Sequence, residues 1–358
     1  MAEHGGNLRL AEEKYKLREE EILDFSSNIN PLGLPSGVKE AILGTYKNII
    51  RYPDPESKEV KEILSVKMNC PPENILIGNG SIELIYLIVS ALKPEKVLIP
   101  VPAFSEYEYC SKLMGAECIF VKSKENKSYK PDLNKIVRGI HDTEILFICN
   151  PNNPTGTSLH KNELKSILKE CKVNNTVMVI DEAFIDFAED INNTSMSSEL
   201  KNNPNLLIIR SLTKLFALPG LRIGYLLGNK NLISKISKYQ YPWAVSYLAQ
   251  EAAKSAVKYA GYIEKTREYI FREKKYLFKN LKKIGWLETY DSDSNFILCK
   301  IKNREHNSKK LADILGEKGI LIRNCSNFRG LNSKHIRIAV KKRKENRILL
   351  DSLREVSW

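Results

Sequence analysis

The sequence predicts an α/β protein, with a large domain on a mostly parallel seven-stranded sheet and a smaller α+β domain. Seven short apolar runs lie between residues 74 and 228, and stretches with helical spacing separate them. Strands that are apolar throughout and alternate with helices indicate a parallel sheet covered on both faces. From about residue 286 the runs alternate apolar and polar residues, which indicates a second sheet with one face towards solvent or the site.

Each predicted element can be assigned to residues. Strands of the large sheet are expected at "NILIG" (74–78), "KVLIP" (96–100), "CIFV" (118–121), "EILFIC" (144–149), "VMVID" (177–181), "LLIIR" (206–210) and "IGYLL" (223–227). Helices are expected at "SIELIYLIVSAL" (81–92) and "KNELKSILKEC" (161–171), and over residues 245–283. The second sheet is expected at "NFILCKI" (295–301), "ILIRNC" (320–325) and "HIRIAV" (335–340).

These elements predict three parts. Residues 1–40, which contain turns such as "HGGN" and "NINPLGLP", are expected to join the small domain or to cover the site. Residues 41–250 form the predicted large, cofactor-binding domain. Residues 251–358 form the predicted small domain, with a long linking helix at its start.

Composition narrows the class of protein. The chain has 358 residues, of which 42% are hydrophobic, enough for one large and one smaller core. No apolar run is long enough to span a bilayer and the N-terminus lacks a signal-like apolar segment, so we expect a cytoplasmic protein. The seven Cys form no C-x-x-C pair and the five His are dispersed, so we expect free thiols and no metal site.

The net charge of +13 raises the alternative of a basic protein that binds anions or nucleic acid without catalysis. The basic residues are scattered and mixed with Glu, as in "YIEKTREYIFREKKY", and no basic arm is present. We therefore expect no nucleic-acid partner. A positive field would instead attract small anionic substrates.

Phosphate-binding residue types surround one lysine. In "RSLTKLFALPGLRIGY" (210–225), Ser211, Thr213 and Arg222 are phosphate ligands by type. Partial burial and the like charge of Arg222 would lower the pKa of Lys214 and make its amine nucleophilic. In "IGNGSIEL" (77–84) a helix opens after a strand, and free N–H groups at Gly80 and Ser81 suit a phosphate. A surface lysine and a plain turn are the structural alternatives.

Two further strand ends supply an amide and a carboxylate. The turn "CNPNNPTG" (149–156) presents Asn152 and Asn153, and Asp181 ends the strand "VMVID". A buried carboxylate needs a partner, and a protonated heterocyclic nitrogen suits it better than a helix cap. Together the four motifs predict a pyridoxal phosphate site, in which Asp181 binds the ring nitrogen and Lys214 binds the aldehyde.

The same motifs resemble those of a known family. N-P-x-N-P-T-G, D-E-A, and S-x-T-K followed by R-x-G-Y resemble the fold-type-I aminotransferases, from about residue 22 to the C-terminus. Within them the chain is similar to the histidinol-phosphate aminotransferase branch. It is most similar to the threonine-phosphate decarboxylases of cobalamin biosynthesis, through "HGGN" (4–7), "LDFSSNINPLGLP" (23–35), "RYPDP" (51–55), "DEAFIDF" (181–187) and "LIRNC" (321–325).

The resemblance implies roles for individual residues. Lys214 and Asp181 would be catalytic, Phe104 would stack on the cofactor ring, and Asn153 would bind its 3-hydroxyl. Tyr52 would reach the cofactor phosphate of a neighbouring subunit, so a homodimer is implied. The cofactor phosphate would be bound by Gly80, Ser81, Ser211, Thr213 and Arg222. The substrate would be bound by His4, Gly5, Asn28, Asn153, Arg323 and Arg337.

The resemblance also implies an activity. We expect decarboxylation of L-threonine O-3-phosphate to aminopropanol O-2-phosphate for the cobalamin nucleotide loop, with L-serine O-phosphate as a further substrate that would give ethanolamine phosphate. A histidinol-phosphate aminotransferase is the alternative. Many aminotransferases carry Tyr where this chain has Phe184, and Phe at this position resembles the decarboxylases. Which of Arg323 and Arg337 binds phosphate and which binds carboxylate stays open at this stage.

Overall fold

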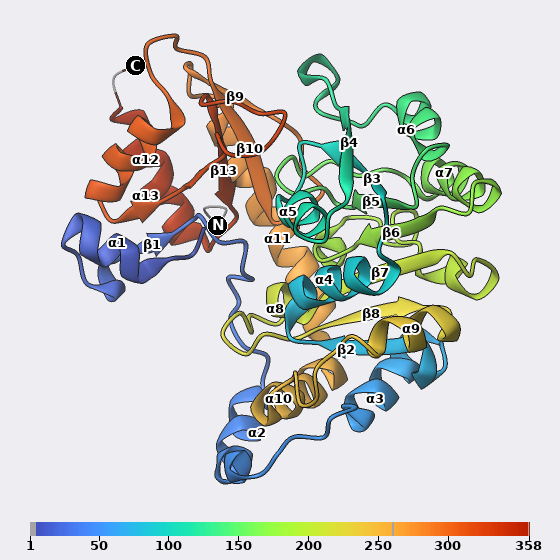
Figure 1. The fold of residues 1–358 in the computed structure, drawn as a ribbon. Coiled ribbons are helices and arrows are strands. Elements are labelled where there is room, and N and C mark those ends of the chain that lie inside the picture. The colour runs from blue at the N-terminus through green and yellow to red at the C-terminus, as the bar shows by residue number, and fades with distance from the viewer. Residues whose placement is uncertain (1–4, 260, 357) are drawn as a thin grey trace.

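A seven-stranded sheet forms the centre of the molecule (Figure 1). The structure is a computed structural model that describes residues 5–259, 261–356 and 358. The sheet contains β2 (Ile75–Gly78), β3 (Lys96–Val101), β4 (Glu117–Lys122), β5 (Ile145–Cys149), β6 (Val177–Asp181), β7 (Leu206–Ser211) and β8 (Gly224–Gly228). Each lies where the sequence predicts a strand, and the predicted fold class is confirmed.

One strand of this sheet runs against the others. The order is β2-β8-β7-β6-β5-β3-β4, and all neighbours are parallel except that β8 is antiparallel to both β2 and β7. The start of β8 therefore lies at the same edge as the carboxyl ends of the other strands. Arg222 lies two residues before β8, so this reversal brings it to the edge where Asp181 ends β6 and where Gly80 and Lys214 follow β2 and β7.

The alternating side chains of the strands pack on two layers of helices. Leu207 and Ile209 of β7 belong to the core under α4 (Gly80–Leu92), α5 (Glu106–Leu113) and α9 (Lys230–Ser237). Leu206 and Ile208 point to the opposite core. That side is covered by α3 (Lys58–Met68), α6 (Leu133–Ile140), α7 (Lys161–Val173) and α10 (Tyr247–Lys258), with α2 (Val38–Thr45) outside α10. Both faces of the sheet are thus buried, as its continuous apolar strands predict.

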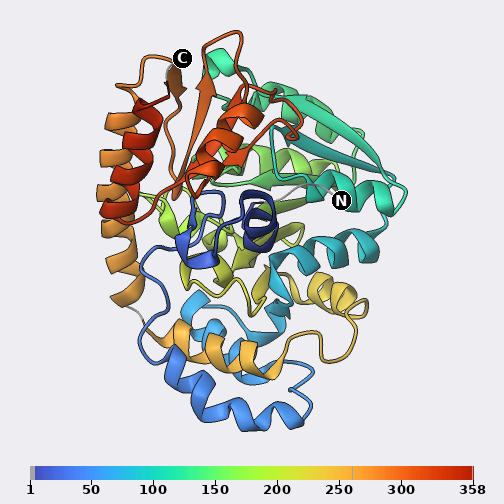
Figure 2. The ribbon, with the colours of Figure 1, turned by 90° about the vertical axis from the view of Figure 1, so that its left-hand side faces the viewer.

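A second sheet of four antiparallel strands lies beside the first. Its order is β12-β13-β10-β9. The strands are β9 (Leu287–Thr289), β10 (Phe296–Ile301), β12 (Arg323–Asn324) and β13 (His335–Ala339), and the nearby helices are α12 (Ser308–Glu317) and α13 (Arg343–Arg354). The long helix α11 (Gly261–Leu281) runs along the side of the molecule from the lower helices to this sheet (Figure 2). The predicted division at residues 40 and 250 stays a prediction.

The structure differs from the sequence prediction near the N-terminus. The sequence analysis assigns no helix to this segment, but the structure has a short one, α1 (Leu8–Tyr15), in which only Ala11 is buried. The predicted strand 320–325 is split. Its first part, β11 (Ile320–Leu321), pairs with β1 (Leu23–Asp24) in a separate two-stranded sheet, and its second part is β12. None of the helices described has both the length and the apolar character needed to cross a bilayer.

A buried ion pair supports the strand ends beneath the site. Arg210, on β7, places Nη2 2.7 Å from Oε2 of Glu182, the residue that follows Asp181. The Ser195 hydroxyl donates to Glu182 at 2.9 Å, and the Met196 N–H donates to its other oxygen at 2.8 Å. Because both charges are buried, the loss of either partner would leave an uncompensated charge at a cost of about 3–5 kcal/mol.

A buried histidine joins the two sheets. His335, on β13, is 1% exposed, and its Nε2 lies 2.7 Å from the hydroxyl of Tyr129 in the loop after β4. Its Nδ1 lies 2.9 Å from Oδ1 of Asn332. Burial lowers the pKa of His335 from 6.5 to about 4. The folded protein therefore holds this imidazole neutral.

We expect His335 to make stability depend on pH. As pH falls below about 6.5, the unfolded chain binds a proton at this residue while the folded chain does not until pH approaches 4. Its contribution is complete above pH 6.5 and is lost towards pH 4, by about 3 kcal/mol at most. Urea unfolding of the wild type and of His335→Gln between pH 4 and 7.5 measures the difference. Equal pH slopes in the two proteins would refute this assignment.

Candidate active site

A cavity of about 300 Å³ lies between the carboxyl ends of the parallel strands and the four-stranded sheet. Its walls come from elements far apart in the sequence, including the ends of β5 and β6, the start of α4, and β12 and β13. The structure brings eleven of the predicted site residues to it. These are Gly5, Asn28, Ser81, Phe104, Asn153, Asp181, Thr213, Lys214, Arg222, Arg323 and Arg337.

Among the described residues, three predicted ones do not line this cavity. Gly80 and Ser211 are adjacent to it, because Gly80 precedes Ser81 and the Ser211 hydroxyl lies 2.8 Å from that of Thr213. Tyr52 is 79% exposed, and its ring stacks on Trp243 at 4.6 Å, away from the cavity of its own chain. His4 lies outside the described residues.

Lys214 presents its amine to the cavity from α8 (Leu212–Leu215), the short helix that follows β7. Burial first, and then the positive charges of Arg337 and Arg222, lower the pKa of this lysine to about 8, against the opposite effect of Asp181. Burial and the charge of Arg222 act as the sequence predicts. The contribution of Arg337 was not predicted, since it depends on how the second sheet packs against the first.

Asp181 ends β6 and is buried at the cavity wall. Its Oδ2 accepts a hydrogen bond from the Tyr107 hydroxyl at 2.6 Å, and its Oδ1 accepts one from the N–H of Ala183 at 2.9 Å. Burial raises the pKa of the carboxyl, while these hydrogen bonds and the charge of Lys214 oppose the rise. These interactions offset part of the cost of burying the carboxylate charge, and the side chain can bind a cationic N–H donor in the cavity.

The start of α4 and the turn before β8 form a cradle for an anion. Gly80 has φ +76°, and a Cβ at this position would lie 2.6 Å from Nη2 of Arg222. Only glycine therefore allows the guanidinium to approach the first N–H groups of the helix. Arg222 makes no ion pair among the described residues, and the hydroxyl of Thr213 lies on the same cavity wall. Helix N–H groups, a hydroxyl and a guanidinium are ligands that phosphate prefers.

Two arginines face the cavity from the second sheet. Arg323 on β12 and Arg337 on β13 are directly opposite each other in the antiparallel pair, and each is 6% exposed. Arg337 donates to Oδ1 of Asn153 and, at 2.8 Å, to the carbonyl of Ser26. Like charges opposite each other on a sheet are unfavourable, so the pair favours the binding of anions.

The N-terminal segment closes one side of the cavity. Gly6 donates its N–H to the Ser26 hydroxyl at 2.8 Å, and a Cβ on Gly5 would lie 2.4 Å from the Ser26 carbonyl. The two glycines of "HGGN" thus permit close packing of this segment on residues 26–28. Asp24 holds the same loop, since it accepts hydrogen bonds from the hydroxyls of Ser26 and Ser27.

Sequence reasoning missed several residues of the site. Ser26, Ser27, Cys149 and Phe328 also line the cavity, and Tyr107 lies directly behind it. Tyr107 could have been found, because a tyrosine on the apolar face of a helix needs a partner for its hydroxyl. Phe328 could not, since its place depends on the packing of the loop between β12 and β13.

The residues present fit pyridoxal phosphate. The cradle at Gly80 suits its phosphate, Asp181 suits its ring nitrogen, and Lys214 suits its aldehyde. Two buried polar atoms next to the cavity, Oδ1 of Asn28 and Nε of Arg337, have no hydrogen-bond partner within the described residues. Unpaired buried polar atoms are costly, which indicates that a polar ligand completes the site.

Comparisons with known proteins agree with this geometry. The chain belongs to the aminotransferase class I and II family, whose model matches residues 20–353. A protein of Caldanaerobacter subterraneus subsp. tengcongensis that is assigned as a threonine-phosphate decarboxylase is 39% identical, over 92% of this chain and 88% of its own. The threonine-phosphate decarboxylase of Salmonella typhimurium is 34% identical, over 99% and 96% of the two chains.

A solved structure agrees in fold. The crystal structure of the histidinol-phosphate aminotransferase from Clostridium acetobutylicum matches with a TM-score of 0.88 at 36% identity, over 94% of this chain and 99% of that one. Membership of the predicted family and its fold is therefore confirmed. Both activities that the sequence analysis weighs occur among the names of these relatives.

The titration of Lys214 can be measured directly. Competitive acetylation of the cofactor-free protein, resolved by peptide mass spectrometry, should give Lys214 an apparent pKa of about 8. Arg337→Gln should raise this value by about one unit, because a nearby positive charge is removed. Arg329→Gln is the matched control, since Arg329 pairs with Glu108 and is not among the causes of the shift. A Lys214 that titrates like a surface lysine would contradict the geometry.

Proposed function

We propose that the protein is a pyridoxal-phosphate-dependent decarboxylase that converts L-threonine O-3-phosphate to aminopropanol O-2-phosphate and carbon dioxide. One observation carries the proposal: Arg323 and Arg337 lie opposite each other and face the cavity that contains Lys214. A phosphorylated amino acid offers one anionic group to each guanidinium at the same time. The names and identities of the two decarboxylase relatives support the same activity.

The cofactor, when bound, supplies an aldehyde that takes up the substrate amine and a ring that accepts the electrons of the bond broken at Cα. Gly80, Ser81, Ser211, Thr213 and Arg222 are proposed to bind its phosphate. Phe104 would contact its ring from the cavity wall, and Asn153 would bind its 3-hydroxyl. Asp181 would keep the ring nitrogen protonated, because a buried carboxylate stabilises a cationic partner.

Lys214 is proposed to act twice. Its amine, with a pKa of about 8, is substantially neutral near that pH and can bind the aldehyde before substrate arrives. Once displaced by the substrate amine, it can carry a proton to Cα after carbon dioxide has left. The C–C bond to the carboxylate breaks, a C–H bond forms, and the amine is retained in the product.

The two arginines are proposed to divide the anions of the substrate. Arg337 acts on the pKa of Lys214, whereas Arg323 is not among its causes, so Arg337 is the closer to the reacting amine. The α-carboxylate is attached to the carbon that bears the substrate amine, and we assign it to Arg337. Arg323, which lines the same cavity as Gly5 and Asn28, would then bind the phosphate. His4 lies outside the described residues and stays a predicted substrate ligand.

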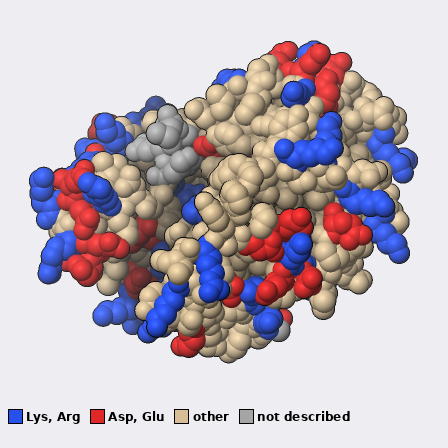
Figure 3. Space-filling model, turned by 60° about the horizontal axis from the view of Figure 1, so that its bottom comes forward, with Lys and Arg blue, Asp and Glu red and all other residues tan. Residues whose placement is uncertain are grey.

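A histidinol-phosphate aminotransferase is the second candidate, favoured by the solved relative at 36% identity. Phe184 argues against it. This side chain lines the cavity and packs edge-on against Phe296 at 5.1 Å, so it offers no hydroxyl where many aminotransferases have tyrosine. A non-catalytic basic protein is disfavoured by the distribution of charge. On the face in Figure 3, Lys and Arg are interspersed with Asp and Glu and form no single basic patch.

A homodimer is proposed as the working form. Tyr52 is exposed and stacks on Trp243, and further apolar side chains of residues 43–50 and 241–243 are exposed as well. These are Leu43, Tyr46, Ile49, Ile50, Tyr241 and Trp243. Such a surface favours burial against a second copy. Tyr52 would then approach the cofactor phosphate in the partner.

The activity can be tested with the purified protein and added pyridoxal phosphate. We expect carbon dioxide release from L-threonine O-3-phosphate without any 2-oxoglutarate, and no release by Lys214→Ala. Borohydride reduction should add the mass of the reduced cofactor to the peptide that contains Lys214. A histidinol-phosphate aminotransferase would transfer the amino group of histidinol phosphate to 2-oxoglutarate and so form glutamate. Glutamate formation without carbon dioxide release would replace the first candidate by the second.

The shared site can be tested by subunit mixing. Tyr52→Ala and Lys214→Ala should each be weakly active or inactive alone. A hybrid dimer has one site with an intact Lys214 and a Tyr52 from the other subunit, so mixing should restore activity. Lack of recovery, with hybrid dimers verified by native mass spectrometry, would show that Tyr52 serves only its own chain or neither site.

A further inference from the structure

Two donors from the protein hold the carboxylate of Asp181. The Tyr107 hydroxyl donates to Oδ2 at 2.6 Å, and the N–H of Ala183 donates to Oδ1 at 2.9 Å. A carboxylate oxygen can accept more than one hydrogen bond, so each oxygen of Asp181 can also bind a ligand in the cavity. Together the two bonds fix the plane of the carboxylate.

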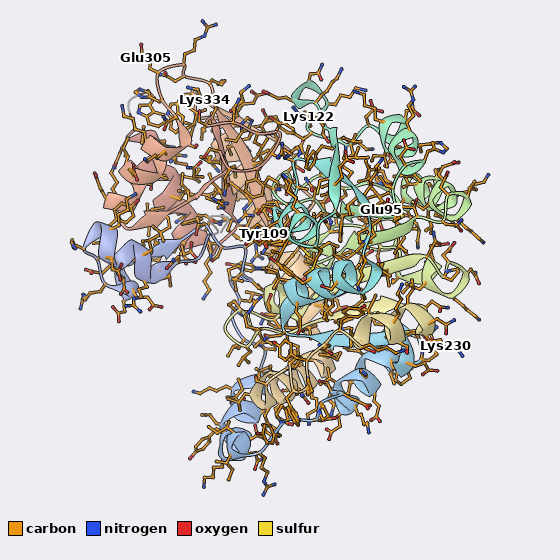
Figure 4. The ribbon with its side chains drawn as sticks, viewed as in Figure 1. Glu95, Tyr109, Lys122, Lys230, Glu305 and Lys334 are labelled. Atoms are coloured by element: carbon orange, nitrogen blue, oxygen red, sulfur yellow. The ribbon has the colours of Figure 1, made fainter. Side chains whose placement is uncertain are left out.

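The ring of Tyr107 is itself tightly held. The residue is 0% exposed and stacks on Phe147 of β5, with centroids 5.0 Å apart and planes 8° from parallel. It also meets Phe104 edge-on at 5.8 Å and 83°. Tyr109, two residues later on α5, is 45% exposed and labelled in Figure 4. The helix therefore directs Tyr107 inward and Tyr109 outward, as expected for residues two apart.

We propose that Tyr107 is a positioning residue of the active site, whose hydroxyl holds Asp181 as an ionised carboxylate and whose ring fixes Phe104. Tyr107 contacts both side chains that the proposed function places on the cofactor ring, one at its nitrogen and one at its face. The inference rests on the proposed function for the identity of that ring. The contacts of Tyr107 with Asp181 and Phe104 do not depend on it.

The charges around Asp181 explain why a neutral donor matters. Burial raises the pKa of Asp181, and the Tyr107 hydrogen bond is the foremost of the effects that lower it. The neighbouring Cys149 stays a neutral thiol, because burial raises its pKa. Glu182 adds negative charge and is bound to Arg210, and Lys214 adds positive charge only while protonated. The Tyr107 hydroxyl stabilises the carboxylate at every working pH, because burial also raises the pKa of this phenol.

The test is the titration of Asp181 in the full-length chain before cofactor is added. Carboxyl ¹³C NMR of protein labelled at aspartate follows it, with the resonance assigned by its loss in Asp181→Asn. Tyr107→Phe removes the hydroxyl and keeps the ring, so the pKa of Asp181 should rise by at least about one unit, a tenfold change in its protonation equilibrium. Tyr86→Phe is the matched control, because the Tyr86 hydroxyl bonds Glu106 at 3.0 Å outside the cavity.

A second substitution gives the opposite sign. Incorporation of 3,5-difluorotyrosine at position 107 strengthens the donor, so the pKa of Asp181 should fall. The 3,5-difluorotyrosine variant tests the role of the Tyr107 hydroxyl even if Tyr107→Phe does not fold. An unchanged Asp181 pKa in the folded variants would overturn the inference. The proposed function is judged separately, by borohydride labelling of Lys214 and carbon dioxide release in the wild type; either can fail while the other stands.

Discussion

An excess of positive charge in one small cavity is the constraint on which the rest of the site depends. Lys214, Arg222, Arg323 and Arg337 line it, and Asp181 is the single acidic residue among the lining side chains described. Charges at such short range in a partly dry site interact strongly. Neutralisation of Lys214 relieves part of the repulsion, and anionic ligands relieve the rest. Burial and this positive charge both lower the pKa of Lys214, and the same charge favours the doubly anionic substrate that we propose.

Strand direction explains how this charge is assembled. Four of the motifs follow parallel strands, whose carboxyl ends meet at one edge of the sheet. Arg222 belongs there only because β8 is antiparallel, so that its start meets the ends of its neighbours. The second sheet then adds Arg323 and Arg337 from across the cavity. The site thus requires both sheets in fixed relation, and the contact of His335 with Tyr129 is one of the bonds that join them.

The sequence predicts the parts of the site that are local. Asp181 and Lys214 could be found because each follows an apolar strand, and Gly80 because a glycine turn opens a helix. The choice of Asp181 as the partner of Tyr107 and the effect of Arg337 on Lys214 could not be derived, since both depend on packing between distant elements. The fold followed from apolar runs long enough to be unambiguous. Helix α1 and the break in the strand at Ile322 were not predicted, because short, charged or interrupted segments have no clear hydrophobic periodicity.

The structure also separates the residues that stabilise the protein from those that serve the ligand. Glu182, the residue after Asp181, pairs with Arg210 and also accepts hydrogen bonds from Ser195 and Met196. At the cavity, Oδ1 of Asn28 and Nε of Arg337 have no hydrogen-bond partner among the described residues, and two guanidinium groups oppose each other. Such features cost stability in the absence of a ligand. A ligand that forms hydrogen bonds and ion pairs with these groups binds only the folded state. By linkage, its binding raises the free energy of unfolding.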